Sequence, residues 1–496
     1  MKRIVIIGSG MGGASVALAL VNKGFDVIVL EAGNEMPASD LGLSPVTEVG
    51  KPNTLNQFRA IQIGGTSNLW HGVVGLYDKR DFGCNEEKKW PIPYAELLPF
   101  WKAAFQFLTG QDPKDSFLFF DQVDDLFENK SFVTINKKYG AFKKFNVLIR
   151  PTRLIRKLQS SVRSGDLKIF KNHRAISLIY EEDSQEKVIG VKCHDGINFV
   201  EIKGDIFVVS AGAVESPCIL LRSKFTNPGD VHNPFGNIGS WLSDHPMGFL
   251  AKIKFKYKVF GHRLSDIKKN KFLKERYGII ENNNNGLNIN IYLRPASKNK
   301  IDSNVNKSMI SFLGINGIKD INIRQLFALI QSPENIYRII NYFLPINFKR
   351  KYWELFMVSE QTPIKSSSVK LGPVDRLGIE SSVIDWNISE NDIGYIKNFI
   401  SDLVKNKIFN EDYLISDILS AEDWVNHSSS AAHMMGTMRM GLDPKLSVVD
   451  LNLKLHSINN LYVCDASVLP CVGNVNPSLT ICALSHRLSS HLLKLL

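Results

Sequence analysis

The 496-residue sequence predicts an α/β fold with two domains, one built on a parallel sheet and one containing an antiparallel sheet. Three observations predict it. The N-terminal residues place apolar runs and a helix-forming stretch in the order of a Rossmann-like βαβ unit. Residues 251–424 instead hold alternating segments separated by Asn-rich and Lys-rich turns, which is typical of antiparallel strands. A chain of this length is also too long for one compact core.

The first βαβ unit is short and continuous. Residues 3–8 contain a short continuous apolar run, as expected of a central parallel strand buried on both faces. Residues 14–22 suit a helix that Gly24 ends. Residues 27–30 then form a second buried strand, which Glu31 closes.

The turn inside this unit fits the pattern G-x-G-x-x-G from Gly8 to Gly13. Glycines let the backbone turn tightly and approach a pyrophosphate, whose charge the helix N-terminus meets. Glu31 can accept the hydroxyl groups of an adenosine ribose, which argues against a 2′-phosphate. We therefore expect a dinucleotide, either FAD or NAD, on the following residues: Gly8, Gly10, Met11, Gly12, Gly13 and Glu31.

Later stretches extend the parallel-sheet domain. They predict strands within 168–200, a strand over 205–212, a helix over 214–223, a strand over 461–465 and a helix over 478–495. We expect a discontinuous nucleotide-binding domain over 1–80, 150–250 and 425–496, a connecting or lid region over 81–149, and a substrate-binding domain over 251–424.

Composition narrows the class of protein. The net charge of +11 is spread along the chain, and no nucleic-acid-binding motif accompanies it, so we expect no nucleic-acid partner. The six cysteines form no C-x-x-C pair and no metal-ligand spacing, so we expect reduced thiols and no metal. The basic N-terminus and its apolar run resemble a signal peptide, but glycines in nucleotide-loop order interrupt that run. The expected location is the cytoplasm.

Residues 336–353 mix aromatic side chains with a basic cluster. A membrane-surface contact is one interpretation of this stretch. We favour an ordinary helix and loop packed on the sheet, because aromatic stretches are most often core.

Three longer motifs are most informative together. Residues 64–71 read Gly-Gly-Thr-Ser-Asn-Leu-Trp-His, residues 239–246 read Gly-Ser-Trp-Leu-Ser-Asp-His-Pro, and the run over 433–484 includes Asn-Pro-Ser-Leu-Thr at 476–480. In order and spacing they resemble the glucose-methanol-choline (GMC) oxidoreductases, across nearly the whole chain. The Trp of the first motif and the final Asn-Pro-x-x-Thr are most similar to the pyranose-oxidase-like bacterial branch. The resemblance implies FAD, a sugar-like alcohol as small-molecule substrate and a separate electron acceptor.

The resemblance also implies where FAD is held. Besides the glycine loop, the expected contacts come from Gly65, Thr66, Ser67, Asn68, Leu69, Trp70, Ala211, Gly212, Asp465, Ala466, Asn476 and Pro477. For Asp465 the alternative is a turn-forming Asp after a strand. Pyranose oxidases tether their flavin to a His directly before the motif Trp, where this sequence has Leu69. We therefore expect non-covalent FAD, and His71, which follows the Trp, does not occupy the tethering position.

Alcohol oxidation needs a base that removes the hydroxyl proton while hydride leaves for flavin N5. His433 lies in the motif that resembles the catalytic segment of the family, and histidine titrates in a suitable range. Asn476 matches the second active-site position and can hydrogen-bond the substrate oxygen. The alternative for His433 is a buried histidine satisfied by hydrogen bonds. We interpret His245 and His456 as structural.

Other functions stay open at this point. A flavin disulfide reductase needs a second G-x-G-x-x-G and a redox C-x-x-C, and the sequence has neither. A non-redox lyase of the same family would keep FAD as a structural element, and a non-enzymatic flavin-binding protein would need no base. We favour an alcohol oxidoreductase, and a dehydrogenase over an oxidase, because a peroxide-producing cytoplasmic enzyme is less expected. The substrate, the carbon oxidised and the oligomeric state stay open.

Overall fold

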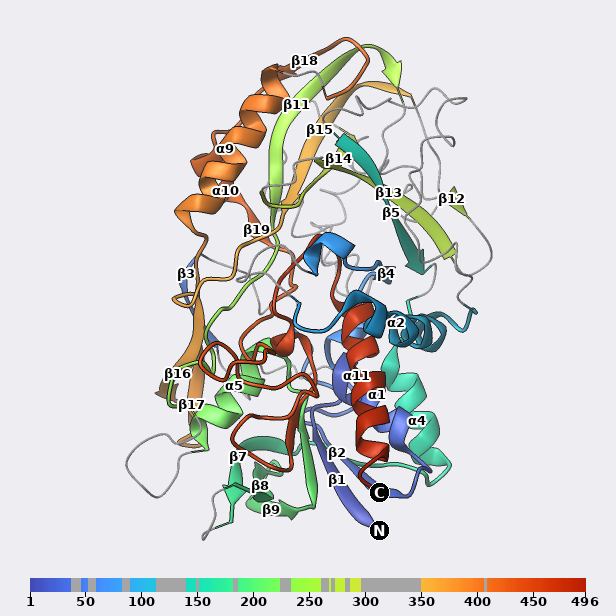
Figure 1. Ribbon diagram of the computed structural model, residues 1–496, viewed down its shortest axis with the longest axis vertical. Coiled ribbons are helices and arrows are strands. Elements are labelled where there is room, and N and C mark those ends of the chain that lie inside the picture. Colours follow the sequence, from blue (N-terminus) through green and yellow to red (C-terminus); the bar gives the residue numbers. More distant parts are fainter. Residues whose placement is uncertain are drawn as a thin grey trace, which may run out of the picture.

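In the computed structural model, the described part of the chain forms two regions, each built around a sheet. The described residues are 1–36, 46–51, 59–82, 90–112, 140–148, 151–181, 186–223, 233–259, 267–268, 273–281, 286–295, 349–405 and 408–496. A parallel sheet lies near both termini, and a large antiparallel sheet lies at the opposite end of the molecule (Figure 1). The predicted α/β fold class is confirmed.

The parallel sheet has five strands in the order β20-β10-β1-β2-β6. They are β1 (Lys2–Ile7), β2 (Phe25–Leu30), β6 (Lys168–Phe170), β10 (Ile206–Val209) and β20 (Leu461–Val463). β1 is the middle strand, and its residues 4–7 are buried, as expected where helices cover both faces of a parallel sheet. Three separate stretches of chain therefore supply one sheet, while the exact domain boundaries stay a prediction.

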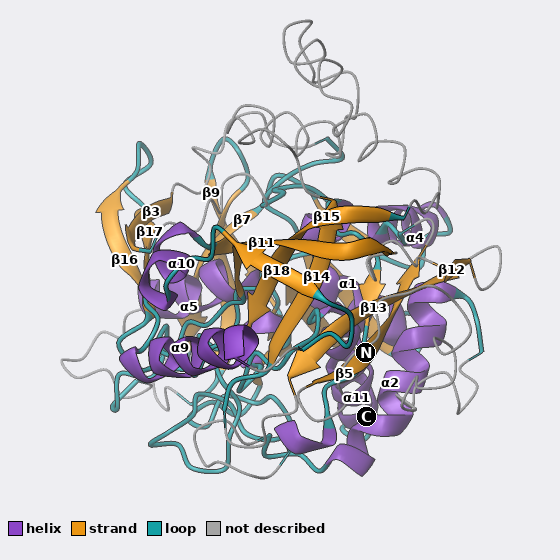
Figure 2. Ribbon diagram, turned by 90° about the horizontal axis from the view of Figure 1, so that it is seen from above, coloured by secondary structure: helices purple, strands orange, loops and turns teal. Residues whose placement is uncertain are grey.

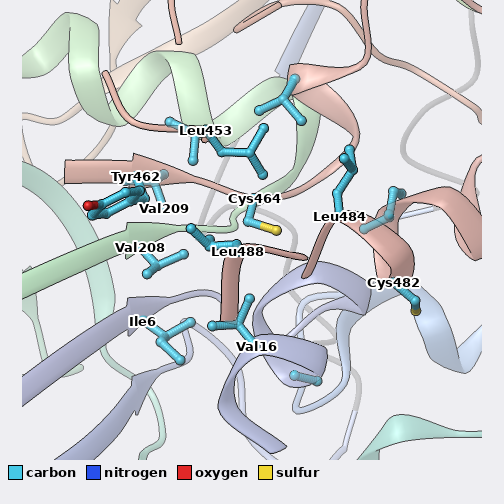
Figure 3. Close-up of a cluster of buried hydrophobic side chains, with 14 of the residues drawn as sticks. Ile6, Val16, Val208, Val209, Leu453, Tyr462, Cys464, Cys482, Leu484 and Leu488 are labelled. Atoms are coloured by element: carbon cyan, nitrogen blue, oxygen red, sulfur yellow. The ribbon is translucent and has the colours of Figure 1, made fainter. Parts of the chain in front are cut away.

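Helices enclose the parallel sheet. They are α1 (Met11–Leu20), α2 (Tyr94–Thr109), α4 (Leu154–Arg163), α5 (Gly212–Arg222) and α11 (Ser478–Leu493). α11 packs against both α1 and α2. Figure 3 shows the resulting core, in which Val16 of α1 and Leu488 of α11 lie with Ile6 and Val208 of the sheet. This packing fixes the position of the loop that precedes α11.

Two small sheets flank the parallel one. The first is an antiparallel meander of β7 (Arg174–Tyr180), β8 (Val188–His194) and β9 (Phe199–Lys203). The second joins β16 (Ser368–Val374), β17 (Glu380–Trp386) and β3 (Val46–Gly50), with β3 parallel to β17. β3 belongs to the first predicted stretch and β17 to the predicted substrate domain. Backbone pairing therefore crosses the predicted boundary.

The large sheet has the strand order β18-β11-β15-β14-β13-β5-β4, with β12 beside β13 and β19 beside β11. Its strands are β4 (Val73–Val74), β5 (Gly140–Leu148), β11 (Pro246–Val259), β12 (Ile267–Lys268), β13 (Leu273–Glu281), β14 (Ile289–Pro295), β15 (Arg350–Ser359), β18 (Tyr413–Ser416) and β19 (Ser429–Ser430). All the pairings are antiparallel, as the sequence predicts for this region. β5 joins them from the predicted connecting region.

Two helices lie beside the large sheet, α9 (Glu390–Lys405) and α10 (Ala421–His427) (Figure 2). They close a second core, in which Trp353 of β15 packs with Phe399 and Trp424. The basic aromatic stretch 336–353 is described only from residue 349 on, and the rest lies outside the described residues. Within the described part of the chain, no helix has both the length and the apolar character needed to cross a membrane.

Candidate active site

The glycine loop after β1 is packed too tightly for side chains. Gly8 has a φ of +97°, and a Cβ there would lie 2.5 Å from the carbonyl oxygen of Ser210. A Cβ on Gly12 would lie 1.9 Å from the carbonyl oxygen of Cys464. A Cβ on Gly13 would lie 2.0 Å from the carbonyl oxygen of Gly8. These glycines let α1 approach the ends of β10 and β20.

Gly10 differs from its neighbours, because a Cβ there would meet nothing within 4 Å. It is the N-cap residue of α1, and no side chain caps that helix. Gly65 lies close by, since its own Cβ would be 3.0 Å from Cα of Gly10. Open space in front of an uncapped helix N-terminus fits the pyrophosphate of a dinucleotide.

Glu31 is buried at the end of β2 and is held by the glycine loop itself. Its carboxylate accepts hydrogen bonds from the backbone N–H of Ser9 at 3.1 Å and of Gly33 at 2.9 Å, and from the Ser9 hydroxyl. The Ser9 hydroxyl in turn accepts from the backbone N–H of Gly64 at 2.9 Å. Burial raises the pKa of Glu31, and these hydrogen bonds oppose the rise. Ser9, which the sequence analysis did not single out, thus links three predicted segments.

Most polar side chains of the 64–71 motif form hydrogen bonds that stabilise their own loop. This loop contains the 3-10 helical segment η3 (Gly65–Asn68). The Ser67 hydroxyl donates to the carbonyl of Gly64 at 2.6 Å. The Asn68 amide donates to the carbonyls of Ile63 and Gly65 at 2.9 and 3.0 Å. The Trp70 indole donates to the carbonyl of Thr152 at 2.8 Å. Thr66 is exposed, and Leu69 is half-buried. Contacts of the motif residues with the cofactor stay a prediction.

Asp465 joins the end of β20 to α5. One carboxylate oxygen accepts from the backbone N–H of Gly212 at 2.9 Å and from the Ser216 hydroxyl at 2.6 Å. The other accepts from the backbone N–H of Ser467 at 2.8 Å and caps the 3-10 segment η7 (Ala466–Val468). The Ser216 hydroxyl also accepts from the backbone N–H of Ala211 at 3.0 Å. The turn-forming role considered as an alternative is present, and a contact of Asp465 with the cofactor stays a prediction.

The two predicted catalytic residues are neighbours. Nδ2 of Asn476 lies 2.9 Å from Nε2 of His433, although the residues are far apart in sequence. Both side chains are half-buried. Asn476 and Pro477 directly precede α11, whereas His433 follows Ala432, which has a left-handed φ of +61°. Such strain in a non-glycine residue persists where the surrounding structure holds it.

The 239–246 motif packs directly against the loop of His433. Ser243 and Met435 exchange backbone hydrogen bonds, and a Cβ on Gly436 would lie 2.5 Å from the carbonyl oxygen of Trp241. Asp244 is fully buried, and one of its oxygens accepts from the backbone N–H of His433 at 3.1 Å. Burial raises the pKa of Asp244 to about 6. The motif is thus a support for the His433 loop.

His245 contacts His433 directly, which the sequence analysis did not predict. The two Nδ1 atoms lie 3.1 Å apart, and the rings are nearly perpendicular at 86°. The other ring nitrogen of His245, Nε2, lies 3.0 Å from the carbonyl oxygen of Gly473. The Asp-His-Pro sequence of the motif was the available signal, but it did not indicate which residue His245 would meet. His456, in contrast, pairs with the Ser447 hydroxyl at 2.8 Å, in line with a structural role.

The electrostatics of the pair favour a neutral base. Burial lowers the pKa of His433 well below its ordinary value, and the repulsion that protonated His245 and His71 would exert on a charged His433 lowers it further. A neutral imidazole can accept a proton at neutral pH. The site can therefore remove a proton at His433 and donate a hydrogen bond from Asn476.

The described cysteines offer no competing redox or metal site. Cys193, Cys218, Cys464, Cys471 and Cys482 are buried and free, and Cys84 lies outside the described residues. Burial raises the pKa of Cys464 and Cys482 to about 12, so both are thiols at neutral pH. Among the described residues, no group of His, Cys, Asp and Glu side chains could hold a metal ion.

Comparisons with known proteins cover both regions of the chain. Residues 363–485 match the family model of the GMC oxidoreductases, and residues 3–234 match the model described as FAD dependent oxidoreductase. The 2-methyl-1,2-propanediol dehydrogenase of Mycolicibacterium austroafricanum is 23% identical, over 99% of this chain and 94% of its own length. The paromamine 6′-oxidase of Streptomyces fradiae is also 23% identical, over 96% of this chain and 88% of its own length.

A solved structure has the same fold. The pyridoxine 4-oxidase from Mesorbium loti superposes with a TM-score of 0.60 at 18% identity, and the match covers 99% of each chain. The similarity in fold therefore extends over both the parallel and the antiparallel sheet regions.

Proposed function

The chain belongs to the GMC oxidoreductases and is FAD-dependent, and from this premise we propose that it oxidises an alcohol group of a sugar-like small molecule with His433 as the base. The observation that carries the proposal is the contact between Nε2 of His433 and Nδ2 of Asn476 at 2.9 Å. A proton acceptor and a hydrogen-bond donor converge there on one point. That is the arrangement a reacting hydroxyl group needs.

A substrate hydroxyl enters this arrangement as both donor and acceptor. Its hydrogen replaces the Asn476 amide at Nε2 of His433, and its oxygen accepts from that amide. The hydroxyl proton then moves to Nε2 as the O–H bond breaks, while Asn476 stabilises the developing negative charge on oxygen. The lowered pKa of His433 supports this role, because it keeps Nε2 free of a proton before substrate arrives.

The residues that would hold FAD are those of the sequence motifs. The N-terminus of α1 at Gly10 would bind the pyrophosphate, and the buried Glu31 carboxylate would accept ribose hydroxyl groups. Gly65, Thr66 and the backbone near Gly212 would approach the rest of the molecule. When bound, FAD accepts the hydride that leaves the alcohol carbon. The absence of a His at Leu69 supports non-covalent binding.

We infer further that the electrons pass to an acceptor other than oxygen. The relative that spans 99% of this chain is named a dehydrogenase, whereas another that spans 96% is named an oxidase. Stoichiometric hydrogen peroxide during turnover in air would contradict the dehydrogenase assignment. Turnover that requires an added dye or quinone would support it.

The test of the proposed function is anaerobic titration of the FAD-loaded protein with a panel of sugars, amino sugars, diols and simple alcohols. We expect at least one sugar-like alcohol to bleach the visible absorption of the flavin, and matched deoxy compounds to leave it unchanged. If chemical reductants bleach the flavin but no alcohol does, the redox assignment fails in favour of a non-redox role for FAD.

A further inference from the structure

Four groups form a continuous row through the candidate active site. The carbonyl oxygen of Gly473 lies 3.0 Å from Nε2 of His245. Nδ1 of His245 lies 3.1 Å from Nδ1 of His433, and Nε2 of His433 lies 2.9 Å from Nδ2 of Asn476. Each contact is within hydrogen-bond distance. Each imidazole therefore uses both ring nitrogens within the row.

The Gly473 end of the row determines which nitrogens carry hydrogen. A carbonyl oxygen only accepts, so Nε2 of His245 must donate to it. A neutral imidazole carries one N–H, which leaves Nδ1 of His245 as an acceptor. Nδ1 of His433 must then be the donor across the 3.1 Å contact, and Nε2 of His433 keeps its lone pair.

The Asn476 end gives the same answer independently. Its amide nitrogen, which only donates, faces Nε2 of His433, and Nε2 must therefore accept. With the opposite tautomer of His433, two N–H groups would face each other at this end and two lone pairs at the His245 end. Burial also disfavours a charge on His245, which is 2% exposed.

His245 itself is held in place by the backbone around it. Its N–H donates to the Asp244 carboxylate at 2.6 Å, and its carbonyl accepts from the backbone N–H of Ala431 at 3.0 Å. The same Asp244 oxygen accepts from the backbone N–H of His433. One carboxylate thus fixes the backbones that carry both imidazoles, so the distance between the two rings is built into the fold.

We propose that His245 is a positioning residue that holds His433 in the Nδ1-protonated tautomer, with the Nε2 lone pair directed toward Asn476 and the substrate hydroxyl. This rests on the proposed function, in which His433 is the base. When the hydroxyl proton reaches Nε2, the O–H bond breaks and an Nε2–H bond forms. Nδ1 keeps its hydrogen, and the imidazolium donates it to His245. His245 therefore orients the base before the step and stabilises its charge afterwards.

The tautomer can be measured without substrate. In FAD-loaded protein labelled with ¹⁵N-histidine, protonated and bare imidazole nitrogens resonate in separate ranges, and His433→Gln assigns the signals of His433 by their loss. We expect a protonated Nδ1 and a bare Nε2. A protonated Nε2 in the wild-type protein would overturn the proposal, whether or not alcohols reduce the flavin.

Two variants of matched design test the role of His245. His245→Phe keeps a ring but removes both nitrogens, whereas His245→Asn keeps an acceptor near the position of Nδ1. Because only Asn476 then opposes the Nε2–H tautomer of His433, we expect the Phe variant to populate that tautomer in part and to reduce its flavin about 10- to 100-fold more slowly, the range found when a metal-binding histidine loses the partner that orients it. We expect the Asn variant to keep the tautomer and most of the rate.

The outcomes distinguish a failure of the proposed function from a failure of the positioning role of His245. If no alcohol reduces wild-type flavin, the proposed function fails. If alcohols reduce it but His245→Phe changes neither tautomer nor rate, the positioning role fails alone. If the Phe variant does not fold, the wild-type spectrum and the Asn variant still test the positioning role. An Asn variant that loses the Nδ1-protonated form of His433 but keeps the wild-type rate would contradict that role.

Discussion

At the residue scale, the surroundings of His433 determine its charge. Burial is the largest cause of its lowered pKa, and the repulsion that protonated His245 and His71 would exert acts in the same direction. The protonated form cannot take a proton from a substrate. A lower pKa therefore moves the loss of activity to lower pH.

The first prediction concerns pH. The rate of flavin reduction by a substrate should stay constant as pH falls through 6.5, the ordinary value for histidine, and should decline only below it. Asp244, with a pKa of about 6, titrates in the same range, so the profile is repeated with Asp244→Asn. Stopped-flow measurement under anaerobic conditions provides the rates. A midpoint at or above 6.5 in both proteins would contradict the account.

The second prediction concerns a substitution that should raise the pKa of His433. Asn476→Asp places a carboxylate 2.9 Å from Nε2 of His433, and an opposite charge at that distance favours the protonated imidazole. The pKa of His433 should rise, so the rate at neutral pH should fall and recover as pH increases. Asn476→Ala is the control, because it removes the amide without adding charge. An Asp variant whose profile coincides with that of the Ala variant would count against the pairing.

Sequence patterns could indicate these residues only in part. His433 and Asn476 stand in motifs that resemble a known family, so their meeting could be expected. The role of His245 depends on a contact between loops that are 188 residues apart, and no local pattern encodes such a contact. The motif itself was visible, but its histidine was interpreted as structural.

At the scale of elements, the sequence predicted those helices and strands that depend on local patterns. The β1–α1–β2 unit, β10 with α5, and β20 before α11 all follow from apolar runs and glycine breaks. The pairing of β3 with β17, and the entry of β5 into the large sheet, were not predicted. A strand carries little information in its own sequence about which distant strand it will join.

The third prediction separates two glycines of one loop. Gly10→Val should fold but lose FAD, because its side chain enters open space in front of α1. Gly12→Val should fail to fold, because its Cβ would lie 1.9 Å from a backbone oxygen. Circular dichroism and the visible absorption of the purified proteins check both. A yellow Gly10→Val protein would refute the placement of the pyrophosphate.

At the scale of the whole molecule, the candidate site lies where the two sheet regions meet. His245 directly precedes β11 of the large sheet, and His433 follows β19, which pairs with β11. Asn476 instead precedes α11, which packs on α1 next to the glycine loop. His433 and Asn476 therefore depend on different regions, and their contact requires both regions to be assembled.

The fourth prediction concerns FAD and this assembly. Acid precipitation should release the flavin into the supernatant, because Leu69 offers no group for attachment. Removal of FAD should lower the Tm, and added FAD should raise it with concentration, as expected of a ligand that binds only the folded state. Flavin that stays in the acid pellet would contradict non-covalent binding.

The most direct test of the central claim is single-turnover reduction of bound FAD by an alcohol substrate in wild-type, His433→Ala and His456→Ala proteins. His456 is the matched control, because it is a half-buried histidine that pairs with Ser447. We predict that His433→Ala retains FAD and slows its reduction about 100-fold or more, the scale expected for loss of a general base, while His456→Ala stays near the wild-type rate. A His433→Ala protein that reduces its flavin at the wild-type rate would contradict the assignment of His433 as the base.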